Sequence, residues 1–189
     1  NQALRKSFIN GEANAMNLTE HLKSRHLDMT LHHPVLDEGT RTVTFFLYNL
    51  SGQLVGFQQY KPDSDKKLSN DPRDSRYFTY KNSQTLAVWG VESLHLTPNV
   101  VFVTEGVFDA ARLTERGVSA LAVLSNNPKP ELKNWLSTLN RKVVVVCDND
   151  KAGKMLAKFG DVAVFTEEKD LGESPDEFVT NLVNQFRAA

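Results

Sequence analysis

The sequence predicts an α/β fold built in two parts. From residue 98 onward, short continuous apolar segments alternate with short helical segments, which is typical of a mainly parallel sheet with helices on both faces. Residues 1–97 combine polar helical segments with β-branched and aromatic segments, which indicates a smaller α+β subdomain. A chain of 189 residues, 40% of them apolar and 24% charged, suffices for one domain or two small ones.

In the first part, residues 1–30 are polar and predict one or two helices, the second of them capped by Asn17. Aromatic and β-branched segments on either side of a glycine-containing turn then predict a hairpin. The further expectations are hairpin strands at 42–47 and 54–60, an exposed loop at 61–75, a short strand at 77–80 and an irregular connection at 81–99.

In the second part, each apolar segment is followed by a helical one, and Gly117 and Gly160 mark two helix ends. The predicted strands are 100–104, 120–124, 143–147 and 162–165, and the predicted helices are 107–116, 131–139, 152–159 and 175–186. We place the boundary between the two parts near residue 97.

Composition excludes several classes of protein. The formal charge of −1, from 22 Lys and Arg against 23 Asp and Glu, excludes a histone-like polycation and an acidic disordered tail. The single cysteine, Cys147, excludes a disulfide scaffold and favours a reducing, cytoplasmic setting. No apolar segment approaches the ~20 residues of a transmembrane helix, so no membrane partner is expected. Because it begins at Asn1, the chain is expected to be an excised fragment or a processed product.

Carboxylates follow three of the predicted parallel strands. Glu105 follows the first, with Asp109 one turn into the next helix; Asp148 and Asp150 follow the third, and Asp176 comes after the fourth. Because sites in such sheets lie beyond the carboxyl ends of the strands, we expect these groups to converge. Clustered carboxylates are neutralised by hard divalent cations, and Mg²⁺ commonly takes one or two of them together with water or phosphate oxygens. The sequence therefore predicts a Mg²⁺ (or Mn²⁺) site suited to phosphoryl transfer.

Helix capping is the simpler interpretation of any one of these groups. An Asp-x-Asp pair after a strand is often only a turn and a cap. The complete ordered set, strand-Glu-Gly-x-x-Asp, then strand-Asp-x-Asp-x-Ala-Gly, then Pro-Asp-Glu, is much harder to obtain from capping alone. We therefore favour a site.

This ordered set resembles the Toprim domain, which is shared by bacterial-type DNA primases, type IA and type II topoisomerases and some nucleases. The resemblance covers about residues 99–187 and implies a four-stranded Toprim sheet. The Toprim glutamate matches Glu105, and its Asp-x-Asp pair matches Asp148 and Asp150. The Asp-Pro-Asp element of the primases matches Ser174-Pro175-Asp176, where Ser replaces the first Asp. Asp170 or Glu173 are the candidates to replace the missing carboxylate.

Residues before the Toprim-like part point to the primases within this group. Residues 42–60 resemble the primase segment that ends in Val-x-Gly-Phe, and Arg76-Tyr77-Phe78 with Asn82 resembles the Lys-Tyr-Leu-Asn-Ser element. Arg76 stands in place of Lys, and residues are inserted before Asn82, which suggests a phage or plasmid version. The resemblance implies the catalytic core of a bacterial-type primase over about residues 40–187.

The primase resemblance implies synthesis of short RNA primers on a single-stranded DNA template from nucleoside triphosphates, beside a replicative helicase acting in trans or fused to the chain. Asp148, Asp150 and Asp176 would hold Mg²⁺ or Mn²⁺. Glu105 would bind metal or handle protons, and Asp109 would complete the acidic shell. Start-site recognition in such primases usually rests on a zinc-binding domain, which a chain with one cysteine cannot contain.

Basic residues near the expected site are candidates for binding nucleotide or template. Lys151 and Lys154 are expected near triphosphate, although solvated helix lysines are an equally good interpretation. Residues 61–81 combine Lys and Arg with interleaved tyrosines, a composition that suits single strands. A merely solvated loop remains the alternative. The expected template contacts are Lys61, Arg76, Tyr77 and Lys81, with Lys66, Lys67 and Arg73 as further basic residues of the segment.

The same residues are compatible with two other functions. A Toprim nuclease would cut DNA with the same metal, and a non-catalytic nucleic-acid-binding module with a decayed site would bind without reacting. Ser174 makes the second alternative conceivable, because it removes a carboxylate of the primase element.

Overall fold

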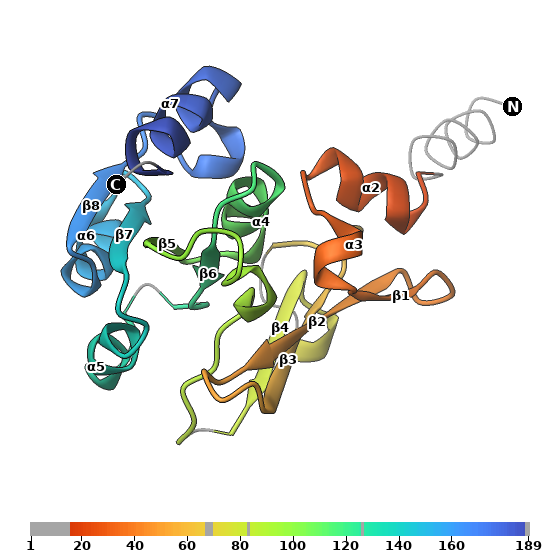
Figure 1. Cartoon of the computed structure of the whole chain (residues 1–189). Coiled ribbons are helices and arrows are strands. Elements are labelled where there is room, and N and C mark those ends of the chain that lie inside the picture. Colours follow the sequence, from red (N-terminus) through yellow and green to blue (C-terminus); the bar gives the residue numbers. More distant parts are fainter. Residues whose placement is uncertain (1–15, 67–69, 83, 126, 188–189) are drawn as a thin grey trace, which may run out of the picture.

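The computed structural model describes residues 16–66, 70–82, 84–125 and 127–187 of the chain, which form two four-stranded sheets lying side by side (Figure 1). The helix expected before Asn17 lies outside these residues. Asn17 does cap α2 (Leu18–Ser24), because its side chain accepts a hydrogen bond from the backbone N–H of Glu20 at 2.8 Å. A second short helix, α3 (Met29–His32), follows.

The first sheet is antiparallel, with the order β1-β2-β3-β4, and confirms the predicted hairpin. Phe46 lies opposite Phe57 across that hairpin, and Gly52 takes a positive φ of 76° in its turn. The edge strand β1 is an addition to the expected elements, since three residues carry too short a pattern to be recognised. The strands are β1 (Val35–Asp37), β2 (Thr42–Tyr48), β3 (Leu54–Tyr60) and β4 (Tyr77–Lys81).

The second sheet is wholly parallel, with the order β6-β5-β7-β8, as the alternation of strands and helices predicts. Its strands are β5 (Val100–Thr104), β6 (Ala120–Ala122), β7 (Lys142–Cys147) and β8 (Val162–Phe165). Its helices are α4 (Val107–Glu115), α5 (Glu131–Ser137), α6 (Lys151–Leu156) and α7 (Asp176–Arg187). Strand β6 ends two residues earlier than expected; Leu124, beyond it, has a left-handed φ of 60° that does not fit a strand.

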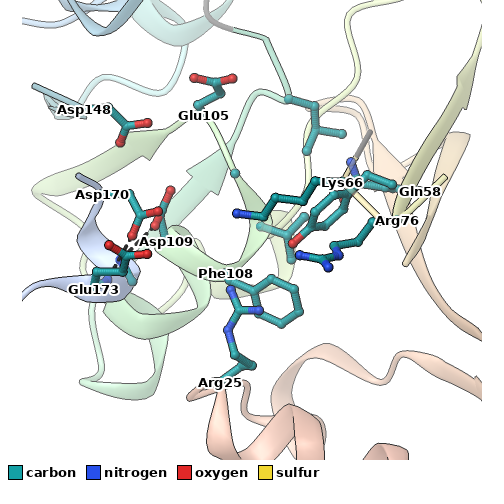
Figure 2. A pocket seen from close by; sticks show the side chains of 15 residues that line it. Arg25, Gln58, Lys66, Arg76, Glu105, Phe108, Asp109, Asp148, Asp170 and Glu173 are labelled. Carbon is teal, nitrogen blue, oxygen red and sulfur yellow. Dashed lines mark hydrogen bonds between the residues drawn. The ribbon is translucent and has the colours of Figure 1, made fainter. Parts of the chain in front are cut away.

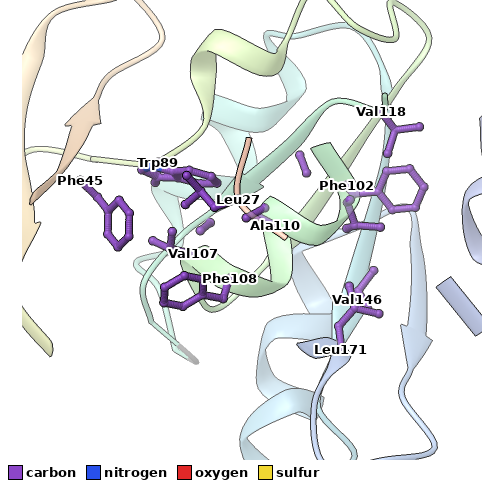
Figure 3. Packing of buried hydrophobic residues seen from close by; sticks show 14 of the residues in the cluster. Leu27, Phe45, Trp89, Phe102, Val107, Phe108, Ala110, Val118, Val146 and Leu171 are labelled. Atoms are coloured by element: carbon purple, nitrogen blue, oxygen red, sulfur yellow. The ribbon is translucent and has the colours of Figure 1, made fainter. Parts of the chain in front are cut away.

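Helices cover both faces of the parallel sheet. On one face, alternate strand residues such as Phe102 and Val146 pack with α4 and α7. On the other face, Val103 and Val145 pack with Leu132 of α5 and with Leu156 of α6. The first apolar cluster continues beyond the parallel sheet. It also contains buried side chains of α2 and β2, including Phe45, so the parts on either side of residue 97 share one core (Figure 3).

A short extended segment before the 3-10 turn Val91–Ser93 joins the two sheets. Val88 forms an antiparallel bridge to Tyr48 of β2, and the next residue, Trp89, forms one to Ala122 of β6. The Trp89 side chain is 1% exposed and packs in the shared core (Figure 3). Gly90 then has a φ of 100°, and a Cβ there would lie 2.5 Å from the carbonyl oxygen of Ala120. We call residues 88–90 the inter-sheet segment.

We expect Gly90→Ala to destabilise the fold, because an L residue is strained at this φ and its Cβ would overlap the Ala120 carbonyl. The free energy of unfolding, measured with urea, should fall by more than about 2 kcal/mol. Gly39→Ala is the matched control. There a Cβ would meet only the flexible Asp37 carboxylate, at 3.3 Å, and stability should change by less than about 1 kcal/mol. Equal effects at both positions would contradict a special role for Gly90.

Candidate functional site

A cavity of about 520 Å³ is lined by residues of both halves of the structure (Figure 2). Carboxylates lie on one side of it and cationic side chains on the facing side, with the ring of Phe108 between them. The carboxylates come from the parallel-sheet half, and the cations come from the end of α2 and from the loop before β4. The acidic wall consists of Glu105, Asp109, Asp148, Asp170 and Glu173, and the cationic wall of Arg25, Lys66 and Arg76.

Glu105 and Asp109 are placed by the junction of β5 with α4. The backbone leaves β5 at Thr104, whose hydroxyl donates to the carbonyl oxygen of Gly106 at 2.9 Å. The Glu105 carbonyl accepts a hydrogen bond from the N–H of Leu124 at 2.8 Å, which fixes the residue at the end of the sheet. Asp109 lies in the first turn of α4 and accepts a hydrogen bond from the N–H of Gly172 at 3.0 Å.

Asp148 and Asp150 lie in the tight turn between β7 and α6. Asp150 caps α6 by accepting a hydrogen bond from the N–H of Gly153 at 2.7 Å, as the simpler interpretation expected. Asp148 directly follows β7 and lines the cavity. A Cβ on Gly153 would lie 1.9 Å from the carbonyl oxygen of Asp148, so the glycine of the motif permits this turn to close.

Burial and mutual repulsion destabilise the ionised carboxylates of the acidic wall, and we call this effect electrostatic strain. Burial raises the pKa of Asp109 to about 7, and the charges of Asp170 and Asp148 add to the shift. Burial, then Glu105, Asp170 and Asp150, raises the pKa of Asp148 to about 6. The pKa of Glu105 is raised as well, first by burial and then by the charge of Asp150. Asp150 therefore acts on this cluster through its charge, although it is exposed and the described cavity wall does not include it.

The donors of the acidic wall are of the kind that a hard divalent cation prefers. A Cβ built on Gly172 would lie 3.2 Å from Asp170 Oδ1 and 3.5 Å from Asp109 Oδ1, so both oxygens border one small space beside the glycine. Within the described ranges, no three His, Cys, Asp or Glu side chains are grouped closely enough to form a complete metal site. The wall therefore fits a cation held by one or two carboxylates, with water or a ligand supplying the other oxygens.

Asp176, an expected metal ligand, is not brought to the cavity. Its carboxylate is 76% exposed and pairs with Arg112 at 2.8 Å and Arg116 at 3.2 Å. The hydrogen bond from Arg112, then its charge, lowers the pKa of Asp176. Asp170 and Glu173, the candidates to replace the missing carboxylate, line the cavity instead.

Arg76 and Tyr77, two of the predicted template contacts, line the cavity. Nε of Arg76 donates to the carbonyl oxygen of Ser64 at 2.9 Å, and the Tyr77 ring stacks on Tyr60 with centroids 5.1 Å apart. Lys66 points its amine across the cavity toward the carboxylates (Figure 2). The remaining expected contacts lie outside the cavity wall in the described part of the chain, and Lys67 lies outside the described residues. Those contacts are Lys61, Lys81, Lys151 and Lys154.

Arg25 is a cavity residue that the sequence did not reveal. It ends α2, its guanidinium lies 3.9 Å from the centroid of the Phe108 ring, and its Nη1 donates to the hydroxyl of Tyr60 at 3.4 Å. The same hydroxyl contacts Nε2 of His21 at 2.7 Å. Nothing in the local pattern of α2 distinguishes Arg25 from a surface residue, because only tertiary packing brings it to the site.

Comparisons with known proteins identify what this chain is similar to. Residues 102–166 match the family model described as Toprim-like. This part of the chain is therefore Toprim-like. It is 35% identical over 109 residues to the DNA primase of Thermotoga maritima, an alignment that covers 56% of this chain and 19% of that protein. It is 27% identical over 149 residues to the DNA primase of Aquifex aeolicus, covering 74% of this chain and 30% of the relative.

Solved primase structures have a similar fold. The zinc-binding and RNA polymerase domains of the Aquifex aeolicus primase match 99% of this chain and 48% of that one, with a TM-score of 0.58 and 20% identity. The primase fragment of the bacteriophage T7 primase-helicase matches 84% of this chain and 68% of that one, with a TM-score of 0.58 and 12% identity. The fold class expected for both halves is therefore confirmed. In the described part of the chain, no helix is both long and apolar enough to cross a bilayer.

The strain in the acidic wall predicts a pH-dependent stability. Asp109 has a pKa of about 7 in the folded chain against 3.8 ordinarily, so stability falls as the pH rises from about 4 to about 7. Asp109→Asn keeps an acceptor for the Gly172 N–H and removes the charge. Its free energy of unfolding should match that of the parent near pH 4 and exceed it at pH 8 by on the order of 3 kcal/mol.

Urea unfolding at both pH values measures this difference, and Glu177→Gln is the control because that carboxylate is exposed and outside the cavity. The control retains Asp109, so its difference in stability from the parent should be the same at both pH values. An Asp109→Asn variant that is less stable than the parent at pH 8 would contradict the strain inferred for the acidic wall.

Proposed function

We propose that this chain is the nucleotidyl-transfer core of a DNA primase, making short RNA primers on single-stranded DNA with Mg²⁺ or Mn²⁺. The observation that carries the proposal is the cavity itself. Its acidic wall lies in the Toprim-like half, and its cationic wall comes from the end of α2 and the loop before β4. The sequence relationship to two bacterial primases supports the reaction class. Because the alignments span 19–30% of those relatives, the activity of the whole protein is part of the proposal.

In this reaction a primer 3′-hydroxyl attacks the α-phosphate of a nucleoside triphosphate, forming a new P–O bond as the bond to pyrophosphate breaks. Asp148 and Glu105, with Asp109 behind them, would hold the divalent cation, and Asp150 would add its charge at the edge of the cluster. A bound cation supplies charge neutralisation at phosphorus. In the alternative role for Glu105, it would take the proton of the attacking hydroxyl instead of binding the cation.

The cationic wall would bind the polyanions that this reaction needs. Arg25, Lys66 and Arg76 face the carboxylates across the cavity and match phosphate groups in charge. Tyr77 offers a ring for stacking against a template base. Lys61 and Lys81, beyond the cavity wall, remain predicted template contacts. Lys151 and Lys154, exposed on α6, remain predicted triphosphate contacts. A replicative helicase in trans or fused to the chain remains the proposed protein partner, and the primase-helicase of bacteriophage T7 is a precedent for fusion.

Glu105→Gln and Asp148→Ala should each reduce primer synthesis at least about 100-fold, because each removes charge from the acidic wall. The assay incubates the chain with a single-stranded template, labelled ribonucleotides and Mn²⁺, and resolves the products by size. Glu177→Gln, away from the cavity, should retain normal synthesis. A normal rate for Glu105→Gln would exclude that residue from the site.

The same assay separates the competing functions. Short ribonucleotide products support the primase. Metal-dependent shortening of the template, without such products, would identify a nuclease. Template binding with neither product, unaffected by Asp148→Ala combined with Asp150→Ala, would identify a non-catalytic module.

Arg76→Ala should weaken binding of a single-stranded template and reduce the slope of log K against log salt by about 1, if Arg76 pairs with one phosphate. Arg73→Ala is the matched control. Arg73 belongs to the same segment but is largely exposed outside the cavity wall, where it pairs with Asp71 at 2.9 Å. Fluorescence anisotropy at several salt concentrations measures both slopes, and an unchanged slope for Arg76→Ala would favour the solvated-loop interpretation.

A further inference from the structure

The buried arginine of α4 holds the segment that follows β8. Arg112 lies one helical turn after Asp109, is 4% exposed, and directs its guanidinium away from solvent. Its Nη1 donates to three backbone carbonyls and its Nη2 to one carboxylate. The acceptors are Leu171 O at 2.7 Å, Gly172 O at 3.2 Å, Ser174 O at 2.6 Å and Asp176 Oδ1 at 2.8 Å.

These contacts fix the backbone that carries Asp170. The 3-10 turn η4 (Leu171–Glu173) is capped by Asp170, whose side chain accepts a hydrogen bond from the N–H of Glu173 at 2.9 Å. The hydroxyl of Ser174 closes the segment by donating to the carbonyl oxygen of Asp170 at 2.9 Å. We refer to residues 170–174, held by Arg112, as the clamped segment.

The clamped segment brings a carboxylate to the acidic wall. The N–H of Gly172 donates to Asp109 Oδ1, and Asp170 Oδ1 and Asp109 Oδ1 border the same space beside Gly172. Figure 2 shows the Asp170 and Asp109 side chains next to each other, with Asp148 above them. Asp176, two residues beyond the segment, is turned to Arg112 and Arg116 instead.

We propose that Arg112 is a positioning residue of this site, fixing the clamped segment so that Asp170, in place of Asp176, completes the acidic wall that receives the divalent cation. The inference rests on the proposed function, which identifies the acidic wall as the cation site. Cation binding itself can be measured without catalysis. Arginine suits this role, since its planar fork satisfies several backbone carbonyls at once and lysine offers a single ammonium. Ser174, which interrupts the primase-like element, then serves the clamped segment through its hydroxyl.

The test measures Mn²⁺ binding to the full chain by electron paramagnetic resonance, with the fold of each variant checked by thermal unfolding. Asp170→Asn should weaken Mn²⁺ binding about tenfold, whereas Asp176→Asn should change it by less than about threefold. Arg112→Lys should weaken binding about tenfold. Arg116→Lys is the matched control, because Arg116 contacts Asp176 but none of the carbonyls of the clamped segment, and it should bind Mn²⁺ normally.

The double variant Arg112→Lys with Asp170→Asn distinguishes positioning from general stability. If Arg112 acts through Asp170, the double variant should bind Mn²⁺ no more weakly than Asp170→Asn alone. Should Arg112→Lys fail to fold, Gly172→Ala replaces it, because its Cβ would enter the space beside Asp170 and Asp109 without touching the arginine contacts. That variant should also weaken binding several-fold.

Additive losses in the double variant, or a tenfold loss in Asp176→Asn with normal binding in Asp170→Asn, would overturn the proposal. Absence of Mn²⁺ binding to the parent chain at millimolar metal would overturn it as well. Failure of primer synthesis alongside the expected Mn²⁺ pattern would overturn the proposed function and support this assignment, so the two failures are distinguishable.

Discussion

The candidate site depends on the hydrogen bonds that tie one sheet to the other. Its acidic wall belongs to the parallel-sheet half and its cationic wall to the antiparallel-sheet half, so the cavity has a defined width only if the sheets are held together. The inter-sheet segment does this with two consecutive bridges, Val88 to Tyr48 and Trp89 to Ala122. Burial of Trp89 between the halves adds an apolar contribution of about 2–3 kcal/mol to these two bridges, beside the core that both halves share.

The two walls face each other without neutralising each other. In the described part of the chain, none of the ion pairs within 4 Å joins a carboxylate of the acidic wall to Arg25, Lys66 or Arg76. Burial, with the charges of neighbouring carboxylates, raises the pKa of Asp109 and of Asp148, and the charge of Arg25 offsets only part of the shift at Asp109. A folded chain that keeps opposite charges apart across a cavity retains both for a ligand, and a phosphate with its divalent counter-ion carries the two complementary charges.

The sequence was sufficient to predict features that depend on neighbouring residues and on where strands end. The apolar alternation predicts the parallel sheet, and the rule for strand ends brings Glu105, Asp109 and Asp148 to one cavity. Features that depend on tertiary packing could not be predicted from the sequence. Arg25 reaches the site from α2 because it packs on Phe108, and Arg112 acts through carbonyls about sixty residues away, which no side-chain pattern encodes.

Asp176 shows why a motif position does not fix a position in space. Side chains three residues apart share a face in a 3-10 turn, so Asp170 and Glu173 can line one cavity together. Continuing that turn would bring Asp176 to the same face. Pro175 prevents this, because a residue before proline is driven out of the helical region, and Ser174 is extended with ψ at 148°. The chain therefore changes direction before α7, and Asp176 starts that helix facing Arg112 and Arg116. Which carboxylate faces the cavity is decided by this bend and by the arginine that holds it.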